Sequence, residues 1–133
     1  MPSVAVGETF TWERTFTDEE VLAFARISGD TGAHHLIRDP EGRLLVHGLL
    51  VATIPTKIGG DVDFIARAMN FEFLRPVFTG DLVRCRATVT EAEPEQRRLR
   101  VGFDVVCVNQ HSKEVLRLLA TGIIRTGAPA TGS

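Results

Sequence analysis

One segment of the chain, residues 48–58 (GLLVATIPTKI), is apolar around nearly the whole circumference of the helix that its pattern predicts. A helix of this kind is expected to be buried, because it has no broad polar side to face water. Pro55 has no backbone N–H to donate, so we expect a kink or an early helix end near residues 51–55. Gly59 and Gly60 are expected to end the element. The rest of the chain is therefore expected to bury this helix.

The second half of the chain has the pattern of β-strands. Apolar residues occupy every second position, as in strands with one buried face, in three segments: residues 69–73, 83–89 and 99–107. A fourth segment, residues 115–124, is apolar on both faces. The sequences PVFTGD, EAEPEQ and NQHSKE are turn-forming and separate these segments. Helices followed by an antiparallel meander place the chain in the α+β class.

The first half of the chain begins with a strand and a capped helix. Residues 8–16 alternate as in a short strand. Thr17 and Glu20 have the spacing of a capping box, and Phe16 with Val21 fits a hydrophobic staple, so a helix is predicted to begin after Thr17. Gly29 is its expected stop, and residues 38–43 (RDPEGR) form a predicted turn.

Composition limits the classes of function. At 133 residues and 44% hydrophobic, the chain is expected to form one domain over residues 1–126, followed by a disordered tail at residues 127–133. A net charge of −2 gives no case for binding nucleic acid or an anionic membrane. The basic cluster of Arg97, Arg98 and Arg100 is interpreted as a solvated strand end. No signal peptide and no apolar run near the ~20 residues of a membrane span is visible, so a cytoplasmic protein is expected.

The cysteines and histidines do not have the spacing of a metal site. Cys85 and Cys107 lack CxxC spacing and are interpreted as two buried, reduced thiols. A zinc site needs more Cys and His at closer spacing than the chain provides, so no metal is expected.

The candidate site lies between the two helices. Asp30 and His35 are five residues apart, just past the expected helix end, and Gly48 opens the central helix. Two titratable groups close together can move a proton, and the first N–H groups of a helix lack partners, so Gly48 N–H can polarise a carbonyl. Each residue also has an ordinary reading: Asp30 as a turn residue, His35 as an exposed loop histidine, and Gly48 as a packing glycine.

The same residues resemble a family pattern. The order is an aromatic residue, Ser-Gly-Asp, a second catalytic His, then a His-Gly helix start, matched here by Phe24, Ser28, Gly29, Asp30, His35, His47 and Gly48. The block FEFLRPVFTGD at residues 71–81 resembles a strand, Arg-Pro-Val turn and Gly-Asp of the same family. Over roughly residues 5 to 126 the chain thus resembles the MaoC-like hot-dog proteins, R-specific enoyl-CoA hydratases and 3-hydroxyacyl dehydratases.

This resemblance implies a fold and an activity. The fold is a single hot dog, a curved antiparallel sheet wrapped around the central helix, and the family usually pairs two such domains, so a homodimer is expected. The activity is the interconversion of a 2-enoyl and an (R)-3-hydroxyacyl thioester without a cofactor. CoA or the phosphopantetheine of acyl carrier protein is part of the substrate. Asp30 and His35 are the implied catalytic residues, Gly48 the carbonyl-binding residue, and Thr56 a substrate-binding residue.

Departures from the pattern keep alternatives open. Gly32-Ala33 replaces Asn-Pro, His34 replaces an aliphatic residue, and the spacer between His35 and His47 is several residues shorter. His34 is therefore interpreted as a pocket wall or a surface residue, while Lys57 is a candidate for the phosphates of CoA or an acidic carrier. A hot-dog thioesterase and a non-catalytic acyl-binding subunit remain alternatives, although the presence of both Asp30 and His35 argues against the latter.

Overall fold

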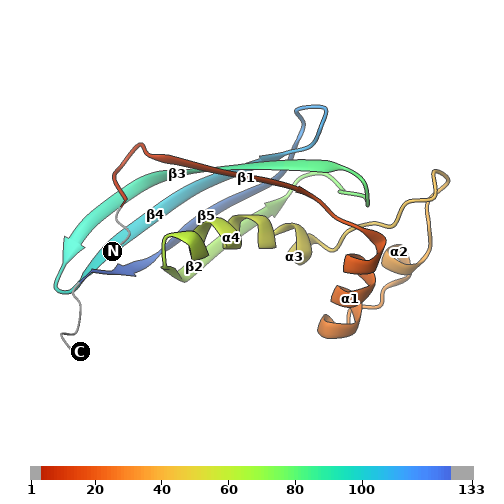
Figure 1. Ribbon diagram of the computed structural model, residues 1–133, viewed down its shortest axis with the longest axis horizontal. Helices are drawn as coiled ribbons and strands as arrows, with labels where there is room; N and C mark the ends of the chain where they lie inside the picture. The colour runs from red at the N-terminus through yellow and green to blue at the C-terminus, as the bar shows by residue number, and fades with distance from the viewer. Residues whose placement is uncertain (1–3, 127–133) are drawn as a thin grey trace.

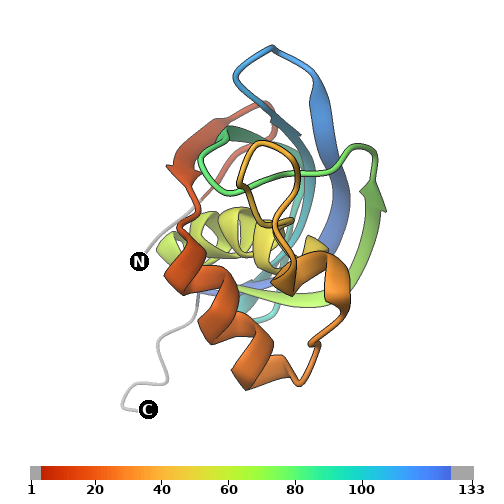
Figure 2. The ribbon, with the colours of Figure 1, turned by 90° about the vertical axis from the view of Figure 1, so that its right-hand side faces the viewer.

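A five-stranded antiparallel sheet curves around a helix that is broken into two pieces (Figures 1 and 2). The computed structural model describes residues 4–126, so the predicted disordered tail at 127–133 lies outside the described residues. The strands follow the order β1-β3-β4-β5-β2 across the sheet. The elements are β1 (Thr9–Thr15), α1 (Asp18–Ser28), α2 (Ala33–Leu36), α3 (Gly48–Val51), α4 (Thr53–Asp61), β2 (Phe64–Phe73), β3 (Leu82–Glu95), β4 (Arg98–Val108) and β5 (Glu114–Arg125).

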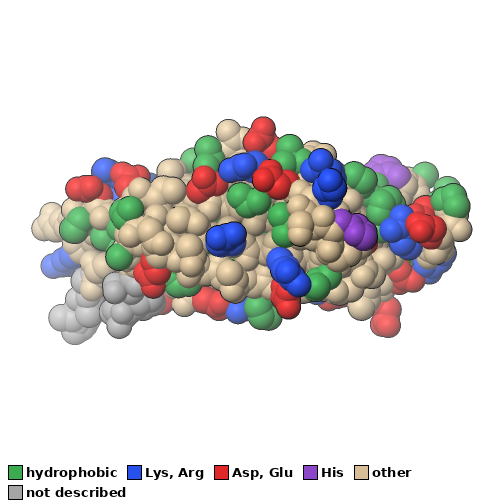
Figure 3. Space-filling view, turned by 90° about the horizontal axis from the view of Figure 1, so that it is seen from above, with side chains coloured by type: hydrophobic (Ala, Val, Ile, Leu, Met, Phe, Trp, Pro, Cys, Tyr) green, Lys and Arg blue, Asp and Glu red, His purple; other side chains and the backbone are tan. Residues whose placement is uncertain are grey.

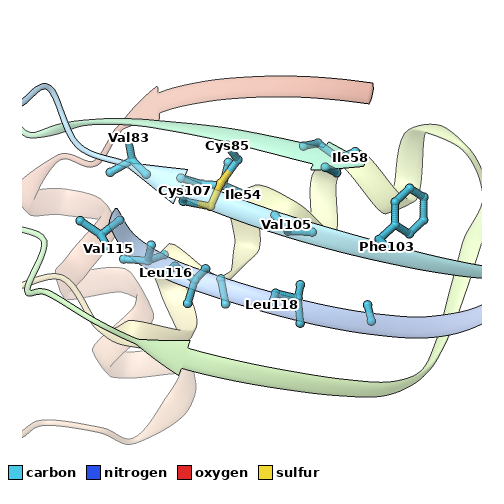
Figure 4. Packing of buried hydrophobic residues seen from close by; sticks show 14 of the residues in the cluster. Ile54, Ile58, Val83, Cys85, Phe103, Val105, Cys107, Val115, Leu116 and Leu118 are labelled. Carbon is cyan, nitrogen blue, oxygen red and sulfur yellow. A yellow bond between two sulfur atoms is a disulfide. The ribbon is translucent and has the colours of Figure 1, made fainter. Parts of the chain in front are cut away.

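The core lies between α4 and the concave face of the sheet. Directly opposed residues share a face of a sheet, and the pairs Ala87↔Val105 and Val105↔Leu118 place one apolar row across three strands. Ile54 and Ile58 of α4 pack onto this row (Figure 4). The period-2 pattern of the sequence is confirmed for residues 83–89 of β3 and 103–107 of β4, where alternate residues are buried and their neighbours are not. It does not hold at residues 101–103, which are buried in succession, or at residues 69–73 of β2, none of which is buried.

The central helix is interrupted where Pro55 predicts it. α3 ends at Val51, and Ala52, with ψ of −15°, lies between it and α4. Because α4 begins at Thr53, Pro55 lies in its first turn, where no N–H donor is needed. Two expectations are wrong: the helix continues past Gly59 and Gly60 to Asp61, and within the single chain it is buried on one side only. The sheet wraps only part of the helix, which leaves the side opposite Ile54 and Ile58 open.

The predicted start and end of the first helix, α1, are confirmed. The side chain of Thr17 accepts a hydrogen bond from Glu20 N, and the Glu20 side chain accepts one from Thr17 N, which completes the capping box of α1. Phe16 and Val21 are both buried in the core. Gly29 has φ of 78°, in the left-handed region that favours glycine, and it ends α1 as predicted. The chain can then turn sharply into the loop that carries Asp30.

Charged side chains of both signs are interspersed over the face seen in Figure 3. In the basic cluster, Arg98 donates to Glu95 at 2.7 Å and Arg100 to Glu91 at 3.0 Å, as expected for a solvated strand end. None of the helices within residues 4–126 combines the length and apolar character needed to cross a bilayer.

Cys85 and Cys107 form a disulfide between β3 and β4, with their Cα atoms 4.1 Å apart (Figure 4). The interpretation as reduced thiols is therefore wrong in this structure. The two cysteines oppose each other in the strand register and are both buried. Their separation of 22 residues gives no hint of a bond, because the pairing depends on how β3 and β4 align.

Reduction of this bond is expected to lower the free energy of unfolding by about 3 kcal/mol, because the bond restricts the unfolded chain. Urea unfolding with and without dithiothreitol measures the effect. The Cys85→Ser/Cys107→Ser double variant is the matched control, and its midpoint is expected not to respond to dithiothreitol. Equal midpoints for oxidised and reduced wild-type protein would contradict the prediction.

Candidate active site

The candidate site lies where the end of α1, the single turn of α2 and the start of α3 meet, at one end of the central helix (Figure 2). Asp30 follows the C-cap of α1, His35 lies on α2, and His47 is the N-cap of α3. The sequence pattern does not predict α2, a helix of four residues. His35 Nε2 lies 3.7 Å from Asp30 Oδ2, so the structure brings the predicted pair together.

The tautomer of His35 is set by a backbone carbonyl. His35 Nδ1 lies 2.8 Å from the carbonyl oxygen of Leu45, which can only accept a hydrogen bond. Nδ1 therefore carries the hydrogen, and in the neutral ring Nε2 presents its lone pair toward Asp30. The side chain of His35 is only 6% exposed, whereas that of Asp30 is 54% exposed. The pair thus combines a fixed imidazole with a carboxylate open to solvent.

The separation within the pair suits one water molecule. At 3.7 Å, Oδ2 and Nε2 are too far apart for a direct hydrogen bond. Both atoms are acceptors when Asp30 is ionised and His35 is neutral, so they have no hydrogen to share. A water molecule can donate one hydrogen to each of them and keep its own lone pairs free. The arrangement can therefore hold a water for attack and accept its proton.

His47 connects this loop to the central helix. Its Nε2 lies 3.0 Å from the carbonyl oxygen of Asp30, and its ring stacks on that of His35 at 3.7 Å between centroids and 14° between planes. The ring of Phe24 lies 4.9 Å from the His47 ring, between centroids, and is tilted by 59° to it. Nothing in the sequence spacing reveals that His47 touches both members of the pair.

A groove of about 440 Å³ reaches His35 of the pair. Its lining includes His34, His35, Gly48 and Phe73. A Cβ on Gly48 would lie 2.8 Å from the Phe73 ring, so glycine allows this close approach. The interpretation of Gly48 as a packing glycine therefore has a physical basis. The carbonyl-binding role of its N–H remains a prediction.

Of the other predicted site residues, His34 lies at the groove, whereas Thr56 and Lys57 lie away from it. His34 is exposed, lines the groove, and has its ring 4.0 Å from that of His35. The hydroxyl of Thr56 donates to Thr53 O at 2.8 Å, and Thr56 lines a separate cavity of about 90 Å³ between α4 and the sheet. Lys57 Nζ lies 2.6 Å from Asp61 and 4.1 Å above the Trp12 ring. The structure does not bring Thr56 or Lys57 to the groove.

The spacer between the two site histidines is held by ion pairs. Arg38 donates to Asp18 at 2.7 Å, at the start of α1, and to the carbonyl of Gly42 at 3.0 Å. The hydrogen bond from Arg38 holds the pKa of the Asp18 carboxyl below its usual value. Leu45 then pairs with Phe78, which fixes the carbonyl that His35 contacts.

Asp30, His35 and His47 each offer a ligand atom, and these atoms lie within 4.8 Å of one another. The geometry fits a metal poorly. Imidazoles ligate through lone pairs in the ring plane, and near-parallel stacked rings aim these lone pairs side by side rather than at one point. His47 Nε2 is moreover engaged with Asp30 O. The arrangement suits a hydrogen-bonded water better.

Comparison with known proteins gives matches over most of the chain. Residues 30–107 match the thioesterase superfamily. The chain is 32% identical over 107 residues to 3-hydroxybutyryl-CoA dehydratase of Methylorubrum extorquens, covering 72% of this chain and 67% of the relative. It is 26% identical over 123 residues to the mitochondrial 3-hydroxyacyl-[acyl-carrier-protein] dehydratase of Arabidopsis thaliana, covering 84% and 71%. The structure of the (R)-hydratase from A. caviae involved in PHA biosynthesis superposes with a TM-score of 0.78 at 23% identity, covering 94% and 98%, which shows a shared fold.

The two buried histidines are expected to hold opposite neutral tautomers. His35 carries its hydrogen on Nδ1, facing Leu45 O, and His47 on Nε2, facing Asp30 O. Long-range ¹H–¹⁵N correlation spectra of the imidazole nitrogens, recorded where both rings are neutral, distinguish the tautomers. The exposed His111 serves as the internal reference for an unconstrained ring. A spectrum in which His35 is the Nε2–H tautomer would rule out a lone pair facing Asp30.

Proposed function

The chain belongs to the thioesterase superfamily as a MaoC-like hot-dog protein, and on that premise we propose that it is a hydro-lyase that interconverts 2-enoyl and (R)-3-hydroxyacyl thioesters. The observation that carries this proposal is the 3.7 Å separation between Asp30 Oδ2 and His35 Nε2. Two acceptors at this distance hold and deprotonate one water without a metal or a redox cofactor. CoA or the phosphopantetheine of acyl carrier protein enters as part of the substrate.

The reaction needs one water and one proton relay. In the hydration direction the water oxygen bonds to C3 of the enoyl thioester while Asp30 or His35 accepts a water proton. A proton from the pair is delivered to C2, so both residues return to their starting state after each turnover. Dehydration runs through the same steps in reverse. Because His35 is buried and its Nδ1 bonds to Leu45 O, its ring is held in one orientation, with Nε2 directed toward Asp30.

The thioester carbonyl requires a hydrogen-bond donor as negative charge develops on it. Gly48 N–H, at the first position of α3, is the proposed donor, because the first N–H groups of a helix lack partners within the helix. Gly48 lines the same groove as His35, which supports placing the carbonyl between them. His34 is proposed as a wall of this groove rather than a proton carrier.

A thioesterase is the second candidate, because the superfamily match is named for that reaction and covers residues 30–107. The same held water would then attack the carbonyl carbon and release the thiol. The dehydratase of Methylorubrum extorquens, at 32% identity, favours the hydro-lyase for this chain. A non-catalytic acyl-binding subunit is the third candidate, and the assembled Asp30–His35 pair speaks against it.

We also propose that the protein forms a homodimer through β2. This strand is an edge of the sheet, and an uncovered edge can pair with a second copy. Beside it, Leu49 is 62% exposed, Met69 38% and Phe73 54%, forming an apolar strip along α3 and β2. Phe73 also borders the groove, so a partner seated on this strip would lie beside the Asp30–His35 pair.

Asp30→Asn and His35→Ala are each expected to lower turnover of crotonyl-CoA by about 10² or more, because positioned acid–base groups contribute typically 10²–10⁴. The double variant is expected to be little worse than either single variant, since the two residues act on one water. His34→Ala is the matched control on the adjacent histidine and is expected to retain most activity. The assay follows loss of enoyl absorbance and release of free thiol in parallel.

Each outcome of this assay separates the candidates. Enoyl loss without thiol release supports the hydro-lyase. Thiol release without enoyl hydration, abolished by Asp30→Asn, replaces the proposal with the thioesterase. A large loss of turnover in His34→Ala, together with nearly unchanged turnover in His35→Ala, would assign the second catalytic role to His34.

The Met69→Glu variant is expected to shift the protein from dimer toward monomer, because the charge would be buried in the apolar strip. Leu119→Glu is the matched control: Leu119 is 58% exposed, on β5, next to Ala120, which faces the core. Sedimentation velocity at micromolar concentration measures both. A wild-type protein that is folded, active and strictly monomeric would refute the dimer.

A further inference from the structure

His47 is a buried polar residue for which the proposed reaction has no chemical step. It is 2% exposed, and its ring contacts the rings of both Phe24 and His35. Its Nδ1 is buried without a hydrogen-bond partner among the described residues. The contact of Nε2 with Asp30 O is thus the one polar contact of the ring within residues 4–126.

The loop that carries Asp30 has few other anchors. Asp30 N donates to Ser28 Oγ at 3.0 Å, and Gly32 N donates to Asp30 Oδ1 at 3.2 Å, but both contacts are local and exposed. His47 reaches Asp30 from 17 residues away, from the start of the helix that the core holds. The hydrogen bond from His47 to Asp30 O therefore connects the exposed catalytic loop to the buried helix, and we call this contact the tie.

The same ring also limits the movement of His35. The two imidazoles stack at 3.7 Å with only 14° between their planes, which restrains the tilt of His35 about its bond to Leu45 O. One residue thus sets the backbone position of Asp30 and the plane of His35. The gap between Oδ2 and Nε2 depends on both.

We propose that His47 is a positioning residue that holds the Asp30 carboxylate and the His35 imidazole one water apart. The inference rests on the proposed hydro-lyase function. A misplacement near 1 Å can cost about 10² in rate. Loss of the tie therefore lowers the rate of the chemical step more than it weakens substrate binding.

The test compares His47→Phe, which keeps an aromatic ring but removes the donor, with His47→Gln, whose amide can donate at a similar reach. His47→Phe is expected to lower kcat by about 10- to 100-fold with KM changed little, and His47→Gln to recover most of kcat. Val89→Ala, in the core, is the matched control for lost stability: it should lower the melting temperature while kcat per folded molecule is kept.

An NMR measurement decides the proposal independently of activity. In His47→Phe the amides of Thr31 and Gly32 are expected to lose order in ¹H–¹⁵N heteronuclear NOE, while those of β4 stay unchanged. If the wild-type protein hydrates no enoyl thioester, the proposed function is wrong. The order of the Thr31 and Gly32 amides then tests by itself whether His47 holds the loop. Unchanged loop order, a kcat for His47→Phe equal to wild type, or a His47→Gln variant as impaired as His47→Phe would each overturn the positioning role.

Discussion

Packing of the central helix against the concave face of the sheet is the interaction on which the rest of the structure depends. Ile54 and Ile58 have no substantial exposure, and each such side chain contributes roughly 1.5–3 kcal/mol by leaving water. This packing fixes the start of the helix as well as its middle. The segment entering the helix is fixed too, since Val46 N donates to Val77 O at 2.8 Å. A hydrophobic contact thereby determines where polar groups at the helix start can lie.

The site is built outward from this anchored end in order of decreasing rigidity. Leu45 lies in a bridge with Phe78, and its carbonyl orients His35. The Asp30 carboxylate, in contrast, lies on an exposed loop and is half open to solvent. An acid–base pair with one rigid and one accessible member can hold a water steady and still admit a substrate. Substrate entry therefore needs no opening of the core.

Local patterns in the sequence predicted what local physics determines. The capping box at Thr17, the stop at Gly29 and the period-2 pattern of β3 all depend on neighbours within a few residues, and all are confirmed. The spacing of Asp30 and His35 suggested a pair, and the family resemblance favoured it over the ordinary readings of the two residues. The His47 tie spans 17 residues, and the disulfide depends on strand register, so neither has a local signal.

The orientation of the central helix was also beyond the reach of sequence patterns. The interruption at Ala52 sets the rotation of α4, and that rotation turns Lys57 toward Trp12 on β1. Motif alignment counts residues as though the helix were continuous, so it carries no such information. Residues before the break, such as Gly48, lie in the groove as expected, whereas Thr56 and Lys57, after it, do not.

The departures from the family pattern are sterically linked. A Cβ at position 32 would lie 2.7 Å from the His34 ring, so the absence of a side chain on Gly32 leaves room for the ring in this position. His34 in turn covers the face of His35 with its ring at 4.0 Å. His34 thus places a polar ring in the lining of the groove, next to the Asp30–His35 pair.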